Sequence, residues 1–149
     1  MIIKNLLETN LFKGCNYENI KSIINENYIN IKKYKKNSII VQEYEECVHI
    51  SIIIKGSLYI NQLLENGDTL RIRLYKENDA FECALFGSNN KNYPFSLISY
   101  EDTEIIHIPF NQINSLLIGD KIFMMNFIKM LSNNITSLKD KIKILSLKS

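Results

Sequence analysis

Few side chains in this sequence are of types that carry out chemistry, and these lie far apart. His49 and His107 are the only histidines, and each falls in a β-branched run typical of a strand. A metal-binding jelly roll needs a His-x-His pair with further histidine and glutamate ligands, which two widely separated histidines do not supply. We find no nucleophile beside a base and no paired carboxylates at a plausible spacing. The sequence therefore predicts no catalytic residue, no metal site and no cofactor.

The three cysteines do not indicate a disulfide framework or a metal site either. Cys15, Cys47 and Cys83 are odd in number and widely spaced, which fits neither a disulfide framework nor a clustered metal site. They indicate reduced thiols and a cytoplasmic protein. Cys83 follows Glu82, which suggests a redox sensor, but a buried and inert cysteine is the commoner state.

The composition is that of an ordinary globular domain. The chain has 149 residues, 46% hydrophobic and 23% charged, with a formal net charge of +2. This charge is too small to indicate nucleic-acid binding by the whole chain. No apolar run approaches the roughly 20 residues of a membrane span, and Glu8 comes too early for a signal peptide. We expect no membrane partner.

The elements that must position these side chains follow from the pattern. Apolar residues near the amino end predict short helices, and Asn16 can cap one that continues to about Asn27. Short β-branched and aromatic runs then alternate with polar clusters, which predicts a mainly β sandwich, barrel or jelly roll with flanking helices. The expected strands are 29–34, 38–42, 48–54, 57–64, 69–75, 95–100 and 104–108. Asn66 and Gly67 predict a two-residue type I′ hairpin turn.

Two helices are expected after the strands. Pro109 suits the first turn of a short helix through Leu117, Gly119 ends it, and Asp120 caps a long final helix. That helix carries an unbroken heptad row with isoleucine at every a position: Met124, Ile128, Leu131, Ile135, Leu138, Ile142 and Leu145. Isoleucine at a with leucine at d favours a parallel two-stranded coiled coil. We therefore expect a homodimer through this helix.

The heptad alone predicts a weak coiled coil. Lys139 and Lys141 occupy e and g positions, where they would repel their counterparts across a parallel dimer. We therefore expect the first turns of the a/d row to pack on the β domain as well.

An ordered set of motifs resembles the cyclic-nucleotide-binding sensor domain of Crp/Fnr-type bacterial transcription regulators. The set comprises Leu-Phe-Lys-Gly at 11–14, Ile-Ile-Lys-Gly-Ser-Leu-Tyr-Ile at 53–60, Asn-Asp-Ala-Phe-Glu-Cys-Ala-Leu-Phe at 78–86 and the strand ending at Pro109. The third motif is similar to the family's phosphate-binding cassette. The resemblance implies a double-stranded β-helix in residues 1–118, followed by a dimerisation helix in residues 119–149.

The resemblance also implies a site between the β roll and the dimer helix. Glu82 falls at the position of the family's ribose-binding glutamate, and Cys83 and Ala84 follow it in the cassette. Tyr93 stands where the family has a phosphate-binding arginine, and Ser96 where it has a hydroxyl. Ser137, with Thr136 and Asn133 nearby, falls where members touch a base. The predicted effector-binding residues are Glu82, Cys83, Ala84, Tyr93, Ser96 and Ser137.

Departures from the family pattern favour an effector other than cAMP. Tyr93 cannot neutralise a phosphate as arginine does. The glycine that precedes the glutamate in the family is either missing here or replaced by Phe81, depending on where a gap is placed. Lys91 is the nearest cation, on a loop that we expect to be mobile. Two other family glycines are replaced by Asn37 and Asn78, and asparagine tolerates a left-handed backbone.

Alternatives remain at each position. Glu82 can be a solvated carboxylate and Ser137 a polar heptad position, while core packing is slightly preferred for Tyr93 and Phe95. The sequence therefore predicts an effector-sensing and dimerisation domain that binds a small molecule of unknown identity. The alternative is a ligand-free dimeric scaffold whose pocket is filled by Phe81 or Tyr93. DNA binding is expected only through a helix-turn-helix domain that these residues do not contain.

Overall fold

Short helices begin the chain and gather beside the β roll. The computed structural model describes residues 2–81 and 83–148. The first elements are α1 (Ile2–Leu7), η1 (Asn10–Phe12), α2 (Tyr17–Ile23) and η2 (Glu26–Tyr28). Asn16 caps α2 as predicted, because its side-chain oxygen accepts a hydrogen bond from the Asn19 N–H at 3.1 Å. The helix ends at Ile23 and not near Asn27, since Asn25 caps the separate turn η2.

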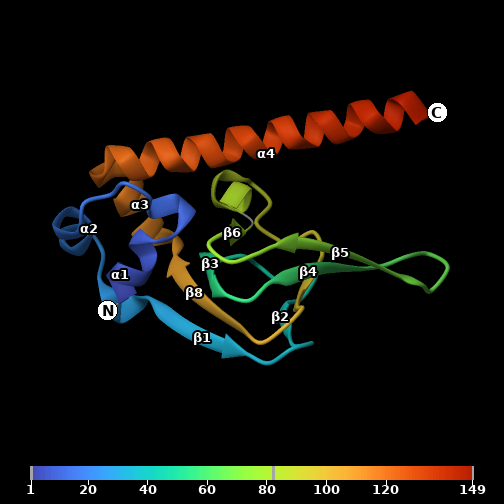
Figure 1. Cartoon of the computed structure of the whole chain (residues 1–149), viewed down its shortest axis with the longest axis horizontal. Coiled ribbons are helices and arrows are strands. Elements are labelled where there is room, and N and C mark those ends of the chain that lie inside the picture. The colour runs from blue at the N-terminus through green and yellow to red at the C-terminus, as the bar shows by residue number, and fades with distance from the viewer. Residues whose placement is uncertain (1, 82, 149) are drawn as a thin grey trace.

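Two antiparallel four-stranded sheets form the roll (Figure 1). One sheet has the order β1-β8-β3-β6 and the other β2-β7-β4-β5. The strands are β1 (Asn30–Tyr34), β2 (Ile39–Val41), β3 (His49–Lys55), β4 (Leu58–Leu63), β5 (Thr69–Tyr75), β6 (Ala80–Phe81), β7 (Ser96–Ser99) and β8 (Thr103–Pro109). All seven predicted strands are present, with ends within one residue of the expected ones. The jelly-roll prediction is confirmed, and only the two-residue β6 was missed.

The hairpin between β4 and β5 is present, but its turn is not the predicted one. Five residues connect Leu63 to Thr69, and Gly67 alone in this turn has a positive φ, of 90°. Asn66 keeps a negative φ and accepts the Asp68 N–H through its side chain at 3.0 Å. The type I′ prediction was wrong because that turn needs a positive φ at both central residues.

Two apolar cores lie on opposite faces of the β1-β8-β3-β6 sheet. Ile52 and Ile106 face the helices with Phe12, Ile20 and Phe123. Ile53 and Ile105, one residue away, face the other sheet with Leu58, Phe81 and Leu97. Because successive strand residues point to opposite faces, β3 and β8 contribute isoleucines to both cores, which explains the adjacent isoleucines at 52–54 and 105–106.

Asparagines replace glycine at two left-handed turns, as predicted. Asn37 has a φ of 64° and Asn78 a φ of 74°. Tyr44, at a φ of 71°, is a third left-handed residue without a sequence signal. A side chain of this size rarely adopts that conformation, so tertiary contacts must hold it there.

The two last helices are joined through Asp120. α3 (Phe110–Gly119) follows Pro109, and α4 (Lys121–Lys148) begins after Asp120, whose carboxylate accepts the Phe123 N–H at 2.8 Å. The predicted cap is confirmed. A Cβ atom at Gly119 would lie 2.9 Å from Ile23 Cδ1, so a larger residue there would displace the Ile23 side chain of α2.

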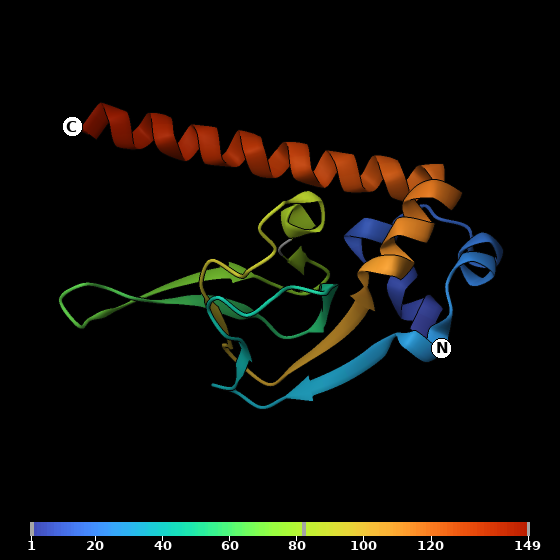
Figure 2. The ribbon, with the colours of Figure 1, turned by 180° about the vertical axis from the view of Figure 1, so that it is seen from behind.

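α4 runs along one side of the molecule and past the roll, toward the end where the β4–β5 hairpin projects (Figures 1 and 2). Phe123 and Phe127 are buried in the core, and Met130 and Leu131 pack against it in part. Ile128 stays 48% exposed. The expectation that the first turns of the a/d row also pack on the β domain is met by Leu131, and Met124 is half-buried, but it fails at Ile128. A neighbouring face with two phenylalanines has more apolar surface to bury.

Candidate functional site

A groove of about 820 Å³ separates the β roll from α4. Its roll side comes from η1, from β5 and β6, and from η3 (Cys83–Gly87), which follows β6 directly. Its helix side carries residues three or four positions apart on one face: Asn126, Lys129, Met130, Asn133, Asn134, Ser137, Leu138 and Lys141. This volume lies within the range of small-molecule sites.

The groove brings together only some of the predicted effector-binding residues. Cys83 and Ala84 line it from the roll, and Ser137 lines it from α4. Tyr93 and Ser96 do not line it, and Glu82 lies outside the described residues. Of the five predicted positions that the structure describes, the groove therefore contains three.

Tyr93 and Ser96 instead fix a loop at the far side of the roll. Tyr93 is buried in the core between the sheets, and its backbone pairs with Tyr44 and Glu45, each at 2.9 Å. The Ser96 hydroxyl accepts the Glu43 N–H at 3.0 Å. Neither residue therefore lines the groove beside α4, because the pairing of this segment with residues 43–45 holds it on the other side of the roll, and a role for them in effector binding stays a prediction.

Lys91 does not face the groove either. Its ammonium donates to the carbonyl oxygens of Phe86 at 2.9 Å and Ser88 at 2.7 Å, and it lies 5.8 Å from the centre of the Phe110 ring. These bonds satisfy the carbonyl groups at the end of η3. Lys91 is thus a structural cation held in place, in contrast to the expected mobile one.

The η3 turn is attached to α4 by sulfur and aromatic contacts. The buried Cys83 thiol lies 3.5 Å from the Met130 sulfur. The Phe86 ring packs edge-on against Phe127, with ring centres 6.0 Å apart. A displacement of η3 would therefore act on the first half of α4 directly.

Cations in the groove come from its rim and from α4. Lys13, Lys129 and Lys141 line it, opposed by Asp79, which is hydrogen-bonded to Asn10 at 3.4 Å. The sequence has only two arginines, Arg71 and Arg73, both on β5. The sequence reasoning did not predict Lys129 and Lys141 as groove residues. Lys129 lies four residues before Asn133 and Lys141 four residues after Ser137, which places them on the same helical face.

Buried acid–base groups near the groove are structural. Asp120 accepts hydrogen bonds from the Phe123 N–H and, at 2.6 Å, from the Asn19 amide, and these outweigh burial to hold the pKa of its carboxyl below the usual value. Burial and the neighbouring Asp120 raise the pKa of the Cys15 thiol to about 12. This thiol is therefore not a nucleophile at neutral pH.

In the described part of the chain, no three histidine, cysteine or acidic side chains gather in a way that could hold a metal ion. Nor does any described helix combine the length and apolar character that crossing a membrane requires.

Comparison with known proteins identifies the domain. Residues 31–120 match the family model described as the cyclic nucleotide-binding domain. The chain belongs to this family. In this cyclic nucleotide-binding domain the match covers the β roll from the second residue of β1 onward, includes α3 and stops before α4. No curated protein matches the sequence.

Solved structures share the fold of this cyclic nucleotide-binding domain. A transcriptional regulator from Thermotoga maritima is 21% identical with a TM-score of 0.75, over 85% of this chain and 96% of that chain. The catabolite activator protein of Thermus thermophilus is 15% identical with a TM-score of 0.76, over 93% of this chain and 63% of that chain.

The sensor domain of the transcriptional regulator DNR from Pseudomonas aeruginosa is 13% identical with a TM-score of 0.72, over 89% of this chain and 91% of that chain. The resemblance to a regulator's sensor domain is therefore confirmed for the domain family and the fold.

Proposed function

We propose that this chain is the effector-sensing and dimerisation domain of a Crp/Fnr-type transcription regulator. The observation that carries this proposal is the groove of about 820 Å³ whose two walls are η3 and α4. In a cyclic nucleotide-binding domain, a ligand between these two elements would contact both the cassette and the long helix. Because η3 also touches α4 through Cys83 and Phe86, a ligand that moves η3 would move the helix.

The proposed effector is a small molecule other than cAMP. A cyclic phosphate in the roll needs a positive partner, and charge-assisted bonds from arginine supply it best. Tyr93 is buried in the core and Lys91 is bonded to carbonyl groups, so neither offers a cation there. The groove's cations lie at its rim and on α4, where they suit an anionic group at the outer end of a partly apolar molecule.

Dimerisation through α4 is supported by the exposed part of its heptad row. Ile128, Ile135, Leu138, Ile142 and Leu145 are between 48 and 66% exposed. A continuous apolar row on one protruding helix is costly in water, and a second α4 in parallel would cover it. Leu138 and Lys141 line the groove as well, so the proposed partner helix would lie beside the effector.

The competing function is a ligand-free dimeric scaffold, and one observation favours it. Phe81 and Tyr93 are 1% and 3% exposed and fill the space between the sheets. A ligand would then have to bind in the groove without entering the roll. The two functions differ in whether any small molecule stabilises the fold.

A thermal-shift panel of cyclic nucleotides, nucleotides and aromatic acids separates the two functions. A sensor is expected to gain about 2.7 kcal/mol from a ligand present at a hundred times its Kd. Ala84→Phe places a phenyl ring in the groove beside η3 and is expected to reduce that shift, whereas Ser115→Phe adds the same ring on α3, outside the groove. No shift with the whole panel in the unmodified chain would favour the scaffold. Equal shifts in both variants would show that the ligand binds outside this groove, and would contradict the proposed site.

A further inference from the structure

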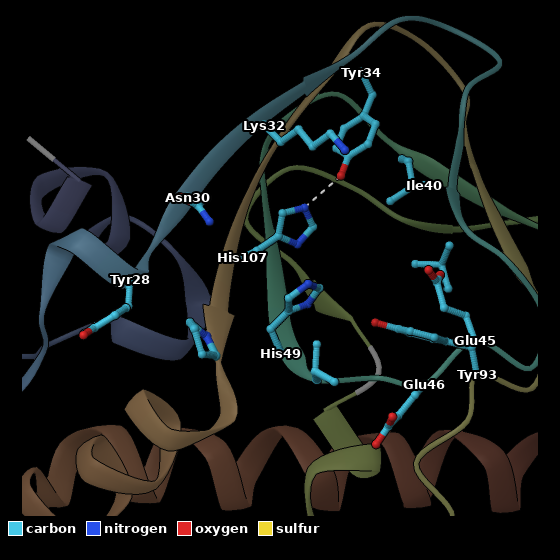
Figure 3. Close-up of a pocket in the computed structure, with 13 residues that line it drawn as sticks. Tyr28, Asn30, Lys32, Tyr34, Ile40, Glu45, Glu46, His49, Tyr93 and His107 are labelled. Carbon is cyan, nitrogen blue, oxygen red and sulfur yellow. Dashed lines mark hydrogen bonds between the residues drawn. The ribbon is translucent and has the colours of Figure 1, made fainter.

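A second cavity, of about 320 Å³, opens at the end of the roll (Figure 3). It shares no lining residue with the groove beside α4. One wall comes from β1, β3 and β8, and the other from β2, Tyr93 and the loop before β3. Its volume is at the lower end of the range for small-molecule sites.

Two histidines far apart in the sequence meet on the first wall. Ser51 pairs with His107 across β3 and β8, and His49, two residues earlier, points to the same face. The two imidazole rings lie 4.5 Å apart. The Ser51 hydroxyl lies 2.7 Å from His107 Nδ1, and the Tyr34 hydroxyl lies 2.9 Å from His107 Nε2.

These imidazoles are neutral near pH 7. Burial lowers the pKa of His107 to about 4, aided by the charges of His49 and Lys32. Burial also lowers the pKa of His49, against smaller opposing effects of its own backbone and of Glu45. The wall therefore presents uncharged rings, which do not repel a cation.

The second wall is fixed before any ligand arrives. The loop at 42–47 is held to residues 91–93 by three backbone hydrogen bonds of 2.7–2.9 Å, two to Tyr93 and one to the Lys91 carbonyl. This loop contains Tyr44, whose left-handed backbone these contacts impose. Glu45 and Tyr93 lie on this hydrogen-bonded loop and its partner segment, across the cavity from the histidines (Figure 3).

Charge in the cavity favours a positive guest. The formally charged lining residues are Glu45, Glu46 and Lys32, with a sum of −1. Burial and the charge of Glu45 both raise the pKa of the Tyr34 hydroxyl, so the Glu45 charge acts on the opposite wall of the cavity. The chain's own Lys32 ammonium already lies 5.2 Å from the centre of the Tyr34 ring, an arrangement typical of cation–π attraction.

We propose that this cavity binds a small organic cation, with its ammonium group between the rings of His49 and Tyr93 and beside the Glu45 carboxylate. Aromatic faces with a nearby carboxylate are the usual surroundings of alkylated ammonium groups. An anion in this cavity would be repelled by the carboxylates of Glu45 and Glu46. This site does not depend on the proposed effector groove, because the two have separate walls.

Choline and its neutral isostere 3,3-dimethyl-1-butanol test this proposal directly. The two molecules match in shape and differ in the charge of the head group. Calorimetric titration of the full chain is expected to show saturable choline binding, and the isostere should bind at least tenfold more weakly. Equal affinities, or no saturable choline binding, would overturn the cation site.

Matched variants locate the site. Glu45→Gln removes the charge but keeps the oxygen that accepts the Gln42 N–H, so the loop should fold, and choline binding should weaken at least tenfold. Glu43→Gln removes an equal charge outside the cavity and should leave binding unchanged. Ala84→Phe, in the other groove, should also leave it unchanged. Loss of choline binding in Ala84→Phe with retention in Glu45→Gln would contradict the assignment.

Discussion

The two halves of α4 carry similar apolar side chains in very different surroundings. In the first half, Phe123 and Phe127 are buried against the amino-terminal helices and β roll. In the second half, Ile135, Leu138 and Ile142 lie open to solvent. One helix can therefore serve two purposes. Its first half belongs to the core of the domain, and its second half is proposed to pack against the α4 of a second copy.

The largest effect on stability is expected from removing a side chain in the buried half of α4. Phe123 is fully buried, with its ring centre 4.9 Å from that of Phe12. Phe123→Ala should lower the free energy of unfolding by about 3–5 kcal/mol, because it leaves a cavity between α4 and the first helices. Chemical denaturation measures this loss.

Leu147→Ala is the matched control in the exposed half. Leu147 is 79% exposed and lies outside the heptad row, so the change should stay within about 0.5 kcal/mol. Similar losses of unfolding free energy in Phe123→Ala and Leu147→Ala would show that the second half of α4 is packed as tightly as the first.

Acid should destabilise the roll to which the first half of α4 is anchored. The pKa of His107 is lowered from 6.5 to about 4, so the folded protein resists protonation more than the unfolded chain does. The contribution of neutral His107 to the free energy of unfolding is therefore fully present above pH 6.5. It is lost as the pH falls toward 4, which lowers the free energy of unfolding by about 3 kcal/mol.

Denaturant unfolding at several pH values between 7 and 4 measures the slope of the unfolding free energy against pH. His107→Gln removes the titrating group and should flatten it. An unchanged slope in the variant would assign the acid sensitivity to other groups, such as His49, whose pKa is also lowered.

The smallest effect on folding is expected from the exposed half, where only assembly should change. Leu138 is 60% exposed in the protomer, so Leu138→Lys should alter the unfolding free energy of the protomer by no more than about 0.5 kcal/mol. Light scattering should nevertheless give monomers, since the substitution places a charge in the proposed seam.

Ile144→Lys makes the same kind of change outside the row, at a residue that is 53% exposed. This variant should remain dimeric. A Leu138→Lys protein that is also dimeric would assign the main interface to another surface.

Local signals made much of this fold predictable. The seven longer strands, the Asn16 and Asp120 caps and the left-handed Asn37 and Asn78 each depend on a few neighbouring residues. The two-residue β6 is too short to have a period, and the turn at Asn66 was decided by a side-chain bond that the dipeptide does not reveal.

The sites were less predictable because they depend on register and on faces. Cys83, Ala84 and Ser137 lie together at the groove, whereas Tyr93 lies outside it because its loop pairs with residues 44–45. His49 and His107 meet only through the pairing of β3 with β8, which strand patterns do not specify. The face of α4 that packs was decided by competition between two apolar stripes.

Leu138 belongs both to the groove and to the heptad row, and this double membership has a thermodynamic consequence. If a ligand and a second helix both contact this side chain, the two binding equilibria are linked, and each changes the other's affinity by the same factor. The apparent affinity of the effector would then vary with protein concentration. Dilution alone, with no change in the sequence, would alter the response of the sensor.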